Sequence, residues 1–260
     1  LAAARQVGRP ADLPKLIEGF LADGERLIVV AGGDGTINTA VNALAGSDAV
    51  LGILARGTAN SFARGLGLPL ELPAAVQALA GGKVIRADVG NVDGKRFANS
   101  MAIGLSPAIS RFQPHRLKRI AGRAGYVIVA AILLPRFRVF ACTIETESGE
   151  RHTFRKASAV RVTNGPYRGG VKASPEADVT SGELVCYVTP GASKWRLIKS
   201  WIELILGRPA RETEVECFQI RQAVIETSPR QYVSLDGDAR MKTPVRVGVE
   251  PGALRVIAPR

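Results

Sequence analysis

Cysteine, acidic residues and long apolar runs are all scarce in this 260-residue chain. The three cysteines, Cys142, Cys186 and Cys217, stand apart, without the close spacing of zinc ligands or the density of a disulfide-stapled domain. This usage favours a reducing, cytoplasmic setting. The longest apolar run, residues 127–134, is far shorter than the roughly 20 residues that a helix needs to cross a bilayer. We therefore expect any contact with a membrane to be peripheral.

The shortage of acidic residues leaves a strongly basic chain. Asp and Glu number 23 against 35 Lys and Arg, which gives a formal charge of +12 and an isoelectric point near 10.2. Such a charge attracts polyanions, and these include a nucleotide, an anionic membrane surface and nucleic acid. Because the basic residues are dispersed and no known nucleic-acid-binding module is recognisable, we do not expect a nucleic-acid partner.

Two consecutive strand-loop-helix units occupy the first third of the chain. Residues 27–31 form an apolar run that precedes a glycine-rich loop and a helical pattern, and residues 50–54 begin a second unit of the same kind. This alternation is typical of an α/β domain with a parallel sheet. Residues 1–24 predict a helix with no strand before it. We therefore expect the first strand of the domain to be absent from this chain.

The pattern changes to short strands after a helix predicted over residues 73–80. We place the domain boundary there, with an α/β nucleotide-binding domain over residues 1–85 and a β-rich domain over residues 86–260. Helical patterns interrupt the second domain at residues 117–134 and 194–206. Turn dipeptides predict hairpins at Asp93-Gly94, Ser148-Gly149 and Pro251-Gly252.

The loop of residues 32–36, GGDGT, has the composition of a phosphate-binding loop. Its glycines let the backbone approach a phosphate, and the helix that follows directs free N–H groups toward the anion. Asp34 would be repelled by bare phosphate, but it can bind a Mg²⁺ ion that arrives with a nucleotide. A lone loop of this kind is more often an ordinary turn, whereas a second one in the next unit, at Gly57, Thr58 and Asn60, favours a triphosphate site. Neither loop is a Walker A motif or a Rossmann fingerprint.

The stretches VVAGGDGTIN (residues 29–38) and LGILARGTANSFARGLG (residues 51–67) resemble the diacylglycerol kinase catalytic-domain family. This family includes soluble bacterial lipid kinases and is related to sphingosine kinases and, more distantly, to NAD kinases. The resemblance implies an ATP-binding α/β domain followed by a C-terminal β-sandwich, and transfer of the γ-phosphoryl group of ATP to a lipid hydroxyl. Further matches occur at residues 86–90, 164–170, 234–238 and 251–256.

The resemblance also implies roles for individual residues. Because a lipid hydroxyl is a poor nucleophile, a carboxylate must take its proton, and the family pattern places this general base at Asp238. Asp88, at the domain junction, is a candidate supporting carboxylate. We expect Mg²⁺ at Asp34. The predicted contacts with ATP are Gly32, Gly33, Asp34, Gly35, Thr36, Ile37, Asn38, Gly57, Thr58 and Asn60.

Four positions depart from the family pattern. Asp238 stands where the family usually has glutamate, and Thr39 and Ser61 replace a glutamate and an aspartate near the nucleotide. Ser181 replaces an aspartate that in family members helps to hold a second, structural magnesium ion. Since misplacing a catalytic group by about 1 Å can cost on the order of 100-fold in rate, one alternative is a nucleotide-binding regulatory relative with weak catalysis.

The acceptor is expected at a membrane, with diacylglycerol or a related lipid alcohol as the substrate. Basic residues on both sides of residues 127–134 fit an interfacial helix on anionic lipid at the inner membrane face, and they fit a core helix with a solvated basic face equally well. A soluble acceptor such as NAD is disfavoured by the matches in the C-terminal half. The sequence does not choose among the lipid alcohols.

Overall fold

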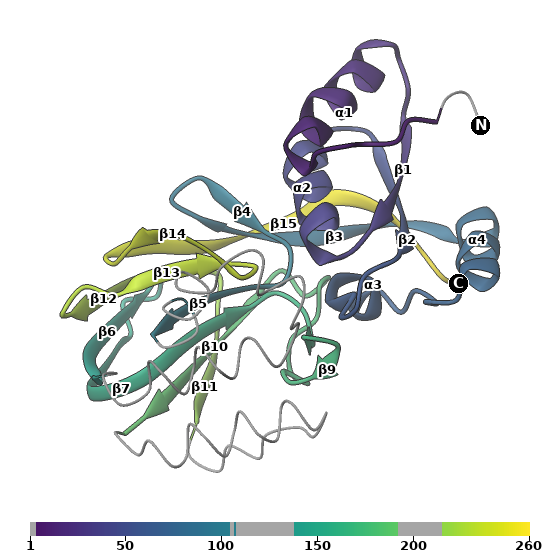
Figure 1. Ribbon diagram of the computed structural model, residues 1–260. Helices are drawn as coiled ribbons and strands as arrows, with labels where there is room; N and C mark the ends of the chain where they lie inside the picture. The colour runs from purple at the N-terminus through teal and green to yellow at the C-terminus, as the bar shows by residue number, and fades with distance from the viewer. Residues whose placement is uncertain (1–3, 105–106, 108–137, 192–214) are drawn as a thin grey trace.

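The computed structural model describes residues 4–104, 107, 138–191 and 215–260, which form two domains side by side (Figure 1). The predicted helices over residues 117–134 and 194–206 lie outside the described residues, and so do the basic residues beside the first of them, except the exposed Arg138. Within the described part, no helix is both long enough and apolar enough to span a bilayer. The helices are η1 (Pro10–Asp12), α1 (Leu13–Ala22), α2 (Asp34–Leu44), α3 (Ser61–Gly65) and α4 (Leu72–Gly81).

The N-terminal domain is built on the two predicted strand-loop-helix units. Strand β1 (Leu27–Gly32) pairs in parallel with β2 (Val50–Ala55), and α2 connects them. Helix α1 packs on α2, whereas α4 lies on the opposite side of the sheet (Figure 1). The apolar residues of α2, at helical spacing, are buried in the core of this domain, which explains why this segment is helical.

The end of the chain returns to complete this sheet. Strand β15 (Val245–Ala258) pairs in parallel with β2 and antiparallel with β3 (Lys83–Val92), so the sheet is mixed. Both β3 and β15 supply residues to the core of each domain. The two domains therefore share strands, and the boundary between residues 85 and 86 stays a prediction.

The C-terminal domain is an antiparallel, β-sandwich-like unit. Its strands follow the order β15-β12-β6-β7-β5-β13-β14, and β10 pairs with both β7 and β11. Burial alternates along β6, and the buried residues of this strand face a second apolar core. The predicted fold class is thereby confirmed. The remaining strands are β4 (Lys95–Phe97), β5 (Ser100–Gly104), β6 (Phe140–Thr146), β7 (Arg151–Thr163), β8 (Tyr167–Arg168), β9 (Val171–Lys172), β10 (Leu184–Pro190), β11 (Glu216–Ile220), β12 (Gln222–Ser228), β13 (Tyr232–Leu235) and β14 (Asp238–Lys242).

Two of the three predicted hairpins are confirmed, and the third is wrong. Asp93-Gly94 joins β3 to β4, and Ser148-Gly149 joins β6 to β7. Pro251-Gly252 instead lies within β15, where the register against β3 shifts between Glu250 and Leu254. Gly252 has a φ of +58°, which a bulge accommodates without reversing the chain. A Pro-Gly pair is compatible with a hairpin turn and with a β-bulge. The dipeptide alone therefore could not distinguish the two.

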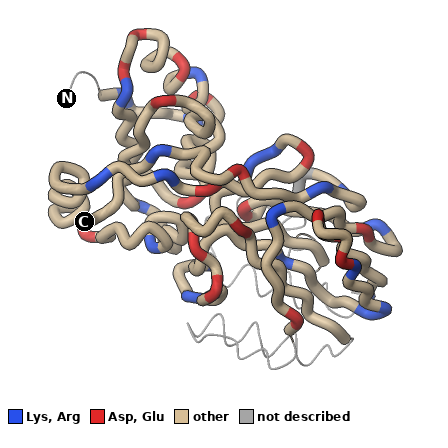
Figure 2. Tube along the Cα trace, turned by 180° about the vertical axis from the view of Figure 1, so that it is seen from behind, with Lys and Arg blue, Asp and Glu red and all other residues tan. Residues whose placement is uncertain are grey.

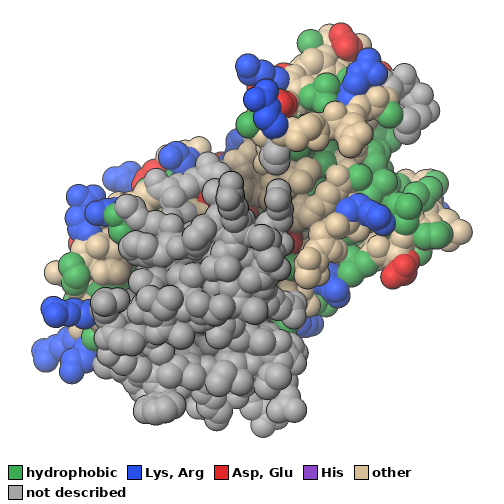
Figure 3. All heavy atoms as spheres, viewed as in Figure 1, with side chains coloured by type: hydrophobic (Ala, Val, Ile, Leu, Met, Phe, Trp, Pro, Cys, Tyr) green, Lys and Arg blue, Asp and Glu red, His purple; other side chains and the backbone are tan. Residues whose placement is uncertain are grey.

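An apolar surface lies on the N-terminal domain, over α4 and the outer strand β1 (Figure 3). Leu27 and Val29 on β1 and Leu72 and Val76 on α4 are each more than 40% exposed. Within the described residues β1 pairs only with β2, so it is an edge strand of the sheet.

Candidate functional site

The first glycine loop ends at the N-terminus of α2. Gly33 caps the helix in an extended conformation, and Asp34 is the first helical residue. A Cβ atom on Gly32 would lie 2.6 Å from the Cβ of Thr36, so only glycine lets the first turn of α2 fold back over the loop. The free N–H groups of this turn and the positive end of the helix dipole make the loop suited to an anion.

The second glycine loop lies directly against the first. A Cβ atom on Gly57 would stand 2.5 Å from the Cα of Gly33, so the two backbones touch. The backbone of Asn60 has a φ of +50°. Its side chain accepts a hydrogen bond from Gly57 N and donates one to Gly57 O, both at 2.8 Å. Ser61 N donates to Asp34 Oδ1 at 2.6 Å and ties the loops together. Thr58, in the second loop, is exposed.

Gly57→Ala is expected to weaken both the fold and nucleotide binding. The added methyl group would collide with Gly33 and with Asn60 Oδ1, 2.8 Å away, at a cost of about 1–3 kcal/mol in the free energy of unfolding. Urea unfolding and the rise in melting temperature with Mg-ATP would measure the two effects. Gly19→Ala is the matched control, because a Cβ there meets nothing within 4 Å. Equal behaviour of the two variants would contradict the contact between the loops.

The turn between β13 and β14 carries the predicted base and a second carboxylate that sequence reasoning missed. Asp238 is the first residue of β14, pairs with Leu235 and is exposed. Asp236, at a φ of +47°, is half-buried at the turn itself. Its carboxylate accepts three backbone hydrogen bonds, from Ala98 N, Asn99 N and Ser100 N at 2.7, 3.0 and 2.8 Å. Asp236 therefore holds the turn that presents Asp238.

The same backbone segment links this turn to the first glycine loop. Ala98 N donates both to Asp236 Oδ2 and, at 3.2 Å, to Oδ1 of Asn38 on α2. Asp34, one helical turn before Asn38, is close enough for its charge to raise the pKa of Asp236. The structure thus brings the two glycine loops and the turn that carries Asp238 to one place, although these segments are far apart in the sequence.

Electrostatics at this junction favour a cation. Burial, and to a smaller extent the charge of Asp34, raise the pKa of Asp236 to about 6, against the lowering effect of the three amides. Two neighbouring carboxylates that repel each other are stabilised by a divalent ion. Oδ2 of Asp34 has no hydrogen-bond partner within the described residues. Since Mg²⁺ bound with a nucleotide needs only one or two protein carboxylates, the residues present fit such an ion.

The raised pKa of Asp236 predicts a pH-dependent stability difference between the parent and Asp236→Asn. Because the folded protein holds this proton up to about pH 6 whereas the ordinary value is 3.8, ionisation of Asp236 opposes folding. The stability of the parent relative to the variant is therefore greatest below pH 3.8 and falls by about 3 kcal/mol as the pH rises through 6. Urea unfolding of both proteins at about pH 4 and about pH 7 would measure the change. A difference that stays constant with pH would contradict the assignment.

Asp88 lies at a different junction. It is 2% exposed, and its two carboxylate oxygens accept hydrogen bonds from Gly182 N at 2.6 Å and Gly252 N at 2.7 Å. These bonds tie β3 to the bulge of β15 and to the loop before β10. Both oxygens bind backbone amides, so Asp88 helps to hold the two domains together, and its supporting role in catalysis stays a prediction.

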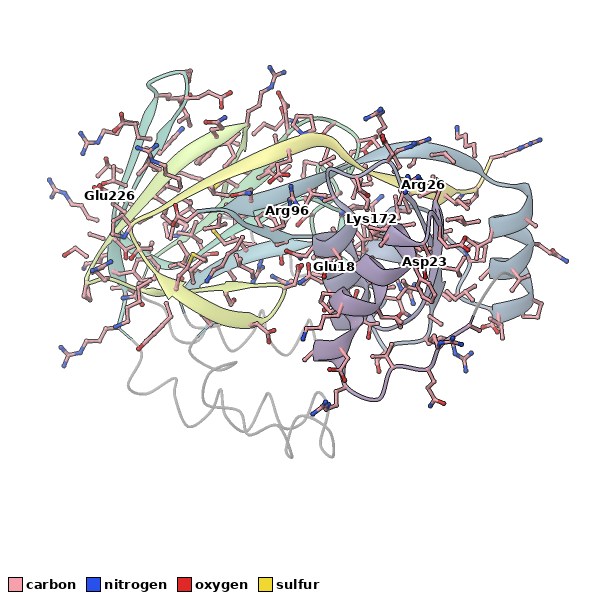
Figure 4. The ribbon with its side chains drawn as sticks, turned by 90° about the horizontal axis from the view of Figure 1, so that it is seen from above. Glu18, Asp23, Arg26, Arg96, Lys172 and Glu226 are labelled. Carbon is pink, nitrogen blue, oxygen red and sulfur yellow. The ribbon has the colours of Figure 1, made fainter. Side chains whose placement is uncertain are left out.

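Arg96 on β4 joins the same two domains by a second route. Its Nε donates to Glu250 Oε2 at 2.8 Å, and its Nη1 donates to the backbone oxygen of Ala45, just beyond the end of α2, at 3.0 Å. Figure 4 shows Arg96 between the strands and the helical domain. Asn91 donates to the other oxygen of Glu250 at 2.6 Å, so the arginine is held in place. This network positions α2, which carries the first glycine loop, relative to the C-terminal domain.

Family models match nearly the whole chain. A model described as the diacylglycerol kinase catalytic domain matches residues 2–92, and a model described as the YegS C-terminal NAD kinase beta sandwich-like domain matches residues 99–258.

Individual proteins agree with the family models. A "Probable lipid kinase YegS-like" from Pseudomonas aeruginosa strain PAO1 is 31% identical over 272 residues, covering 100% of this chain and 88% of that protein. A "Diacylglycerol kinase" from Mycobacterium tuberculosis strain H37Rv is 28% identical and covers 97% and 83%. The crystal structure of a putative diacylglycerol kinase from Bacillus anthracis strain Sterne superposes with a TM-score of 0.78 at 26% identity, over 97% of this chain and 82% of that one. The chain therefore belongs to the lipid kinase family that comprises the YegS-like proteins and the bacterial diacylglycerol kinases.

Proposed function

We propose that this chain transfers the γ-phosphoryl group of ATP to the hydroxyl group of a lipid, with diacylglycerol or a related lipid alcohol as the acceptor. The observation that carries the proposal is the meeting of three segments: two glycine loops in backbone contact and the β13–β14 turn, linked through the amide of Ala98. Membership of the lipid kinase family supports the reaction class.

The nucleotide side of the reaction uses the backbone more than the side chains. The N–H groups at the start of α2 and the exposed Thr58 are available to the phosphates of ATP, whereas Asn60 is occupied in shaping its own loop. Asp34 would hold Mg²⁺, which neutralises charge on the phosphoryl oxygens when it is bound. The predicted contacts from Gly32 to Asn38 belong to the same loop and helix start, but the Ile37 side chain is buried in the core of the N-terminal domain, so Ile37 could offer only its backbone.

The acceptor side depends on Asp238. Its carboxylate takes the proton of the lipid hydroxyl as the lipid oxygen forms a bond to the γ-phosphorus, and the bond between this phosphorus and the bridging oxygen of ADP breaks. Asp238 is exposed and stands two residues beyond Asp236, whose three amide bonds hold the turn. The turn thus offers an accessible base on a fixed support.

The distribution of charge is consistent with a nucleotide and a lipid surface as partners. Lys and Arg residues of the described part are spread over both domains and interleaved with acidic residues (Figure 2). Peripheral contact with anionic membrane remains part of the proposal, because the acceptor resides there.

The test is Mg²⁺-dependent transfer of labelled γ-phosphate from ATP into a panel of lipids in mixed micelles. The panel should contain diacylglycerol, a sphingoid base and another lipid alcohol. Labelled lipid is the expected result, and it would identify the acceptor. Absence of any labelled lipid would overturn the proposal.

The alternative is a nucleotide-binding relative with weak catalysis. It is favoured by the residues that depart from the family pattern, since Thr39 and Ser61 have no charge and Asp238 is one methylene shorter than glutamate. A rise in melting temperature with Mg-ATP, without labelled lipid, would support this alternative.

A further inference from the structure

The loop before β10 is closed by a serine hydroxyl. Oγ of Ser181 lies 2.9 Å from the backbone oxygen of Asp178 and 3.1 Å from that of Glu183, so its single hydrogen is shared between these two acceptors. Glu183 N in turn donates to Ser181 Oγ at 3.2 Å. The hydroxyl thereby connects both ends of the loop from residue 178 to residue 183.

The carboxylates around this loop are committed elsewhere. Oδ1 of Asp178 accepts hydrogen bonds from the N–H and the hydroxyl of Thr180, both at 2.8 Å. Glu183 pairs with Arg221 at 3.3 Å, and Asp88 binds Gly182 N. Across the described ranges, no three Asp, Glu, His or Cys side chains come together as a metal site.

These atoms do not fit the structural magnesium ion of the family. Mg²⁺ requires near-octahedral oxygen ligands at about 2.0–2.1 Å, usually with a carboxylate among them. Here the residue at the aspartate position is Ser181, which is uncharged, and its hydrogen points to two backbone oxygens. The hydroxyl hydrogen and a cation would compete for the same lone pairs on these two backbone oxygens. We infer that the Ser181 hydroxyl closes this loop in place of a metal ion, so that the fold of this chain is independent of a second divalent cation.

The position of the loop makes this substitution consequential. Val179, buried in the core of the N-terminal domain, accepts a hydrogen bond at 2.7 Å from the backbone N–H of Asp88. Gly182 N donates to the carboxylate of the same aspartate. The loop therefore supports the junction between the domains, and whatever closes it contributes to the stability of both.

The experiment measures melting temperature in EDTA and in MgCl₂, without nucleotide. Asp34→Ala serves as the background, because it removes the carboxylate expected to bind the ion that accompanies ATP. We expect this protein to melt at the same temperature in both solutions. Adding Ser181→Ala should lower the melting temperature by about 2–4 °C equally in EDTA and in MgCl₂, since a hydrogen-bond donor is lost and no metal replaces it.

A gain-of-metal variant completes the test. Ser181→Asp in the same background restores the family residue and should give a melting temperature that rises with MgCl₂ concentration. The absence of such a rise would overturn the inference, because Ser181 would then not stand at a metal position. The inference would also be overturned if MgCl₂ stabilised the Asp34→Ala protein and the added Ser181→Ala substitution removed that stabilisation. A melting temperature in EDTA that Ser181→Ala leaves unchanged would contradict it as well. None of these readouts depends on kinase activity.

Discussion

Asp34→Ala is expected to lower phosphoryl transfer by more than about 100-fold. The substitution removes the carboxylate at the start of α2, near Asp236, that would balance the charge of a Mg²⁺ ion bound with the nucleotide. It also removes the acceptor for Ser61 N, so the two glycine loops lose one tie. Labelled phosphate transfer at saturating ATP and lipid, measured with the parent alongside, would give the ratio of rates.

Asp48→Ala is the matched control for this variant. Asp48 is exposed, lies in the same domain and carries the same charge, but its carboxylate has no hydrogen bond within the described residues. Its rate should stay within about twofold of the parent, since isolated surface substitutions have small effects. Similar rates for Asp34→Ala and Asp48→Ala would contradict the assignment of Asp34 to the metal-nucleotide site.

Asp238→Ala is expected to lower the rate of transfer by about 10²–10⁴-fold while the affinity for Mg-ATP stays unchanged. This split follows because Asp238 is exposed in the β13–β14 turn, whereas the nucleotide is expected at the two glycine loops, which belong to other segments of the chain. Single-turnover transfer and the nucleotide-induced shift in melting temperature would separate the two quantities. A loss of nucleotide binding together with activity would argue against a role as general base.

Asp238→Glu distinguishes a working base from a degenerate one. If the missing methylene limits the reaction, the glutamate should raise the rate above that of the parent, because the carboxylate moves about 1 Å toward the acceptor. If the backbone already compensates, the rate should fall. Glu226→Ala, an exposed carboxylate on β12 at the far end of the C-terminal domain (Figure 4), is the control for a change of charge. If Asp238→Ala and the control had equal rates, the alternative function, a nucleotide-binding relative with weak catalysis, would describe the protein better.

Adjacent residues alone determined much of the secondary structure of this protein, without any tertiary contact. The apolar runs of β1 and β2, and the glycine loops after them, each depend on a few adjacent residues, so the order strand-loop-helix was readable from the sequence. Short-range turn residues also predicted the hairpins at Asp93-Gly94 and Ser148-Gly149. The family resemblance depended on the same local stretches, and it extended the prediction to a β-sandwich.

Only the tertiary structure decided how these parts meet. Asp236 binds amides that lie 136 to 138 residues away, Asp88 binds Gly252 across 164 residues, and the last strand, β15, inserts beside β2. No pattern of neighbouring residues encodes such pairings, because they depend on how strands are ordered across the sheet. The chain by itself specified which segments could hold a phosphate or supply a carboxylate. The long-range hydrogen bonds determined that these segments lie at one junction.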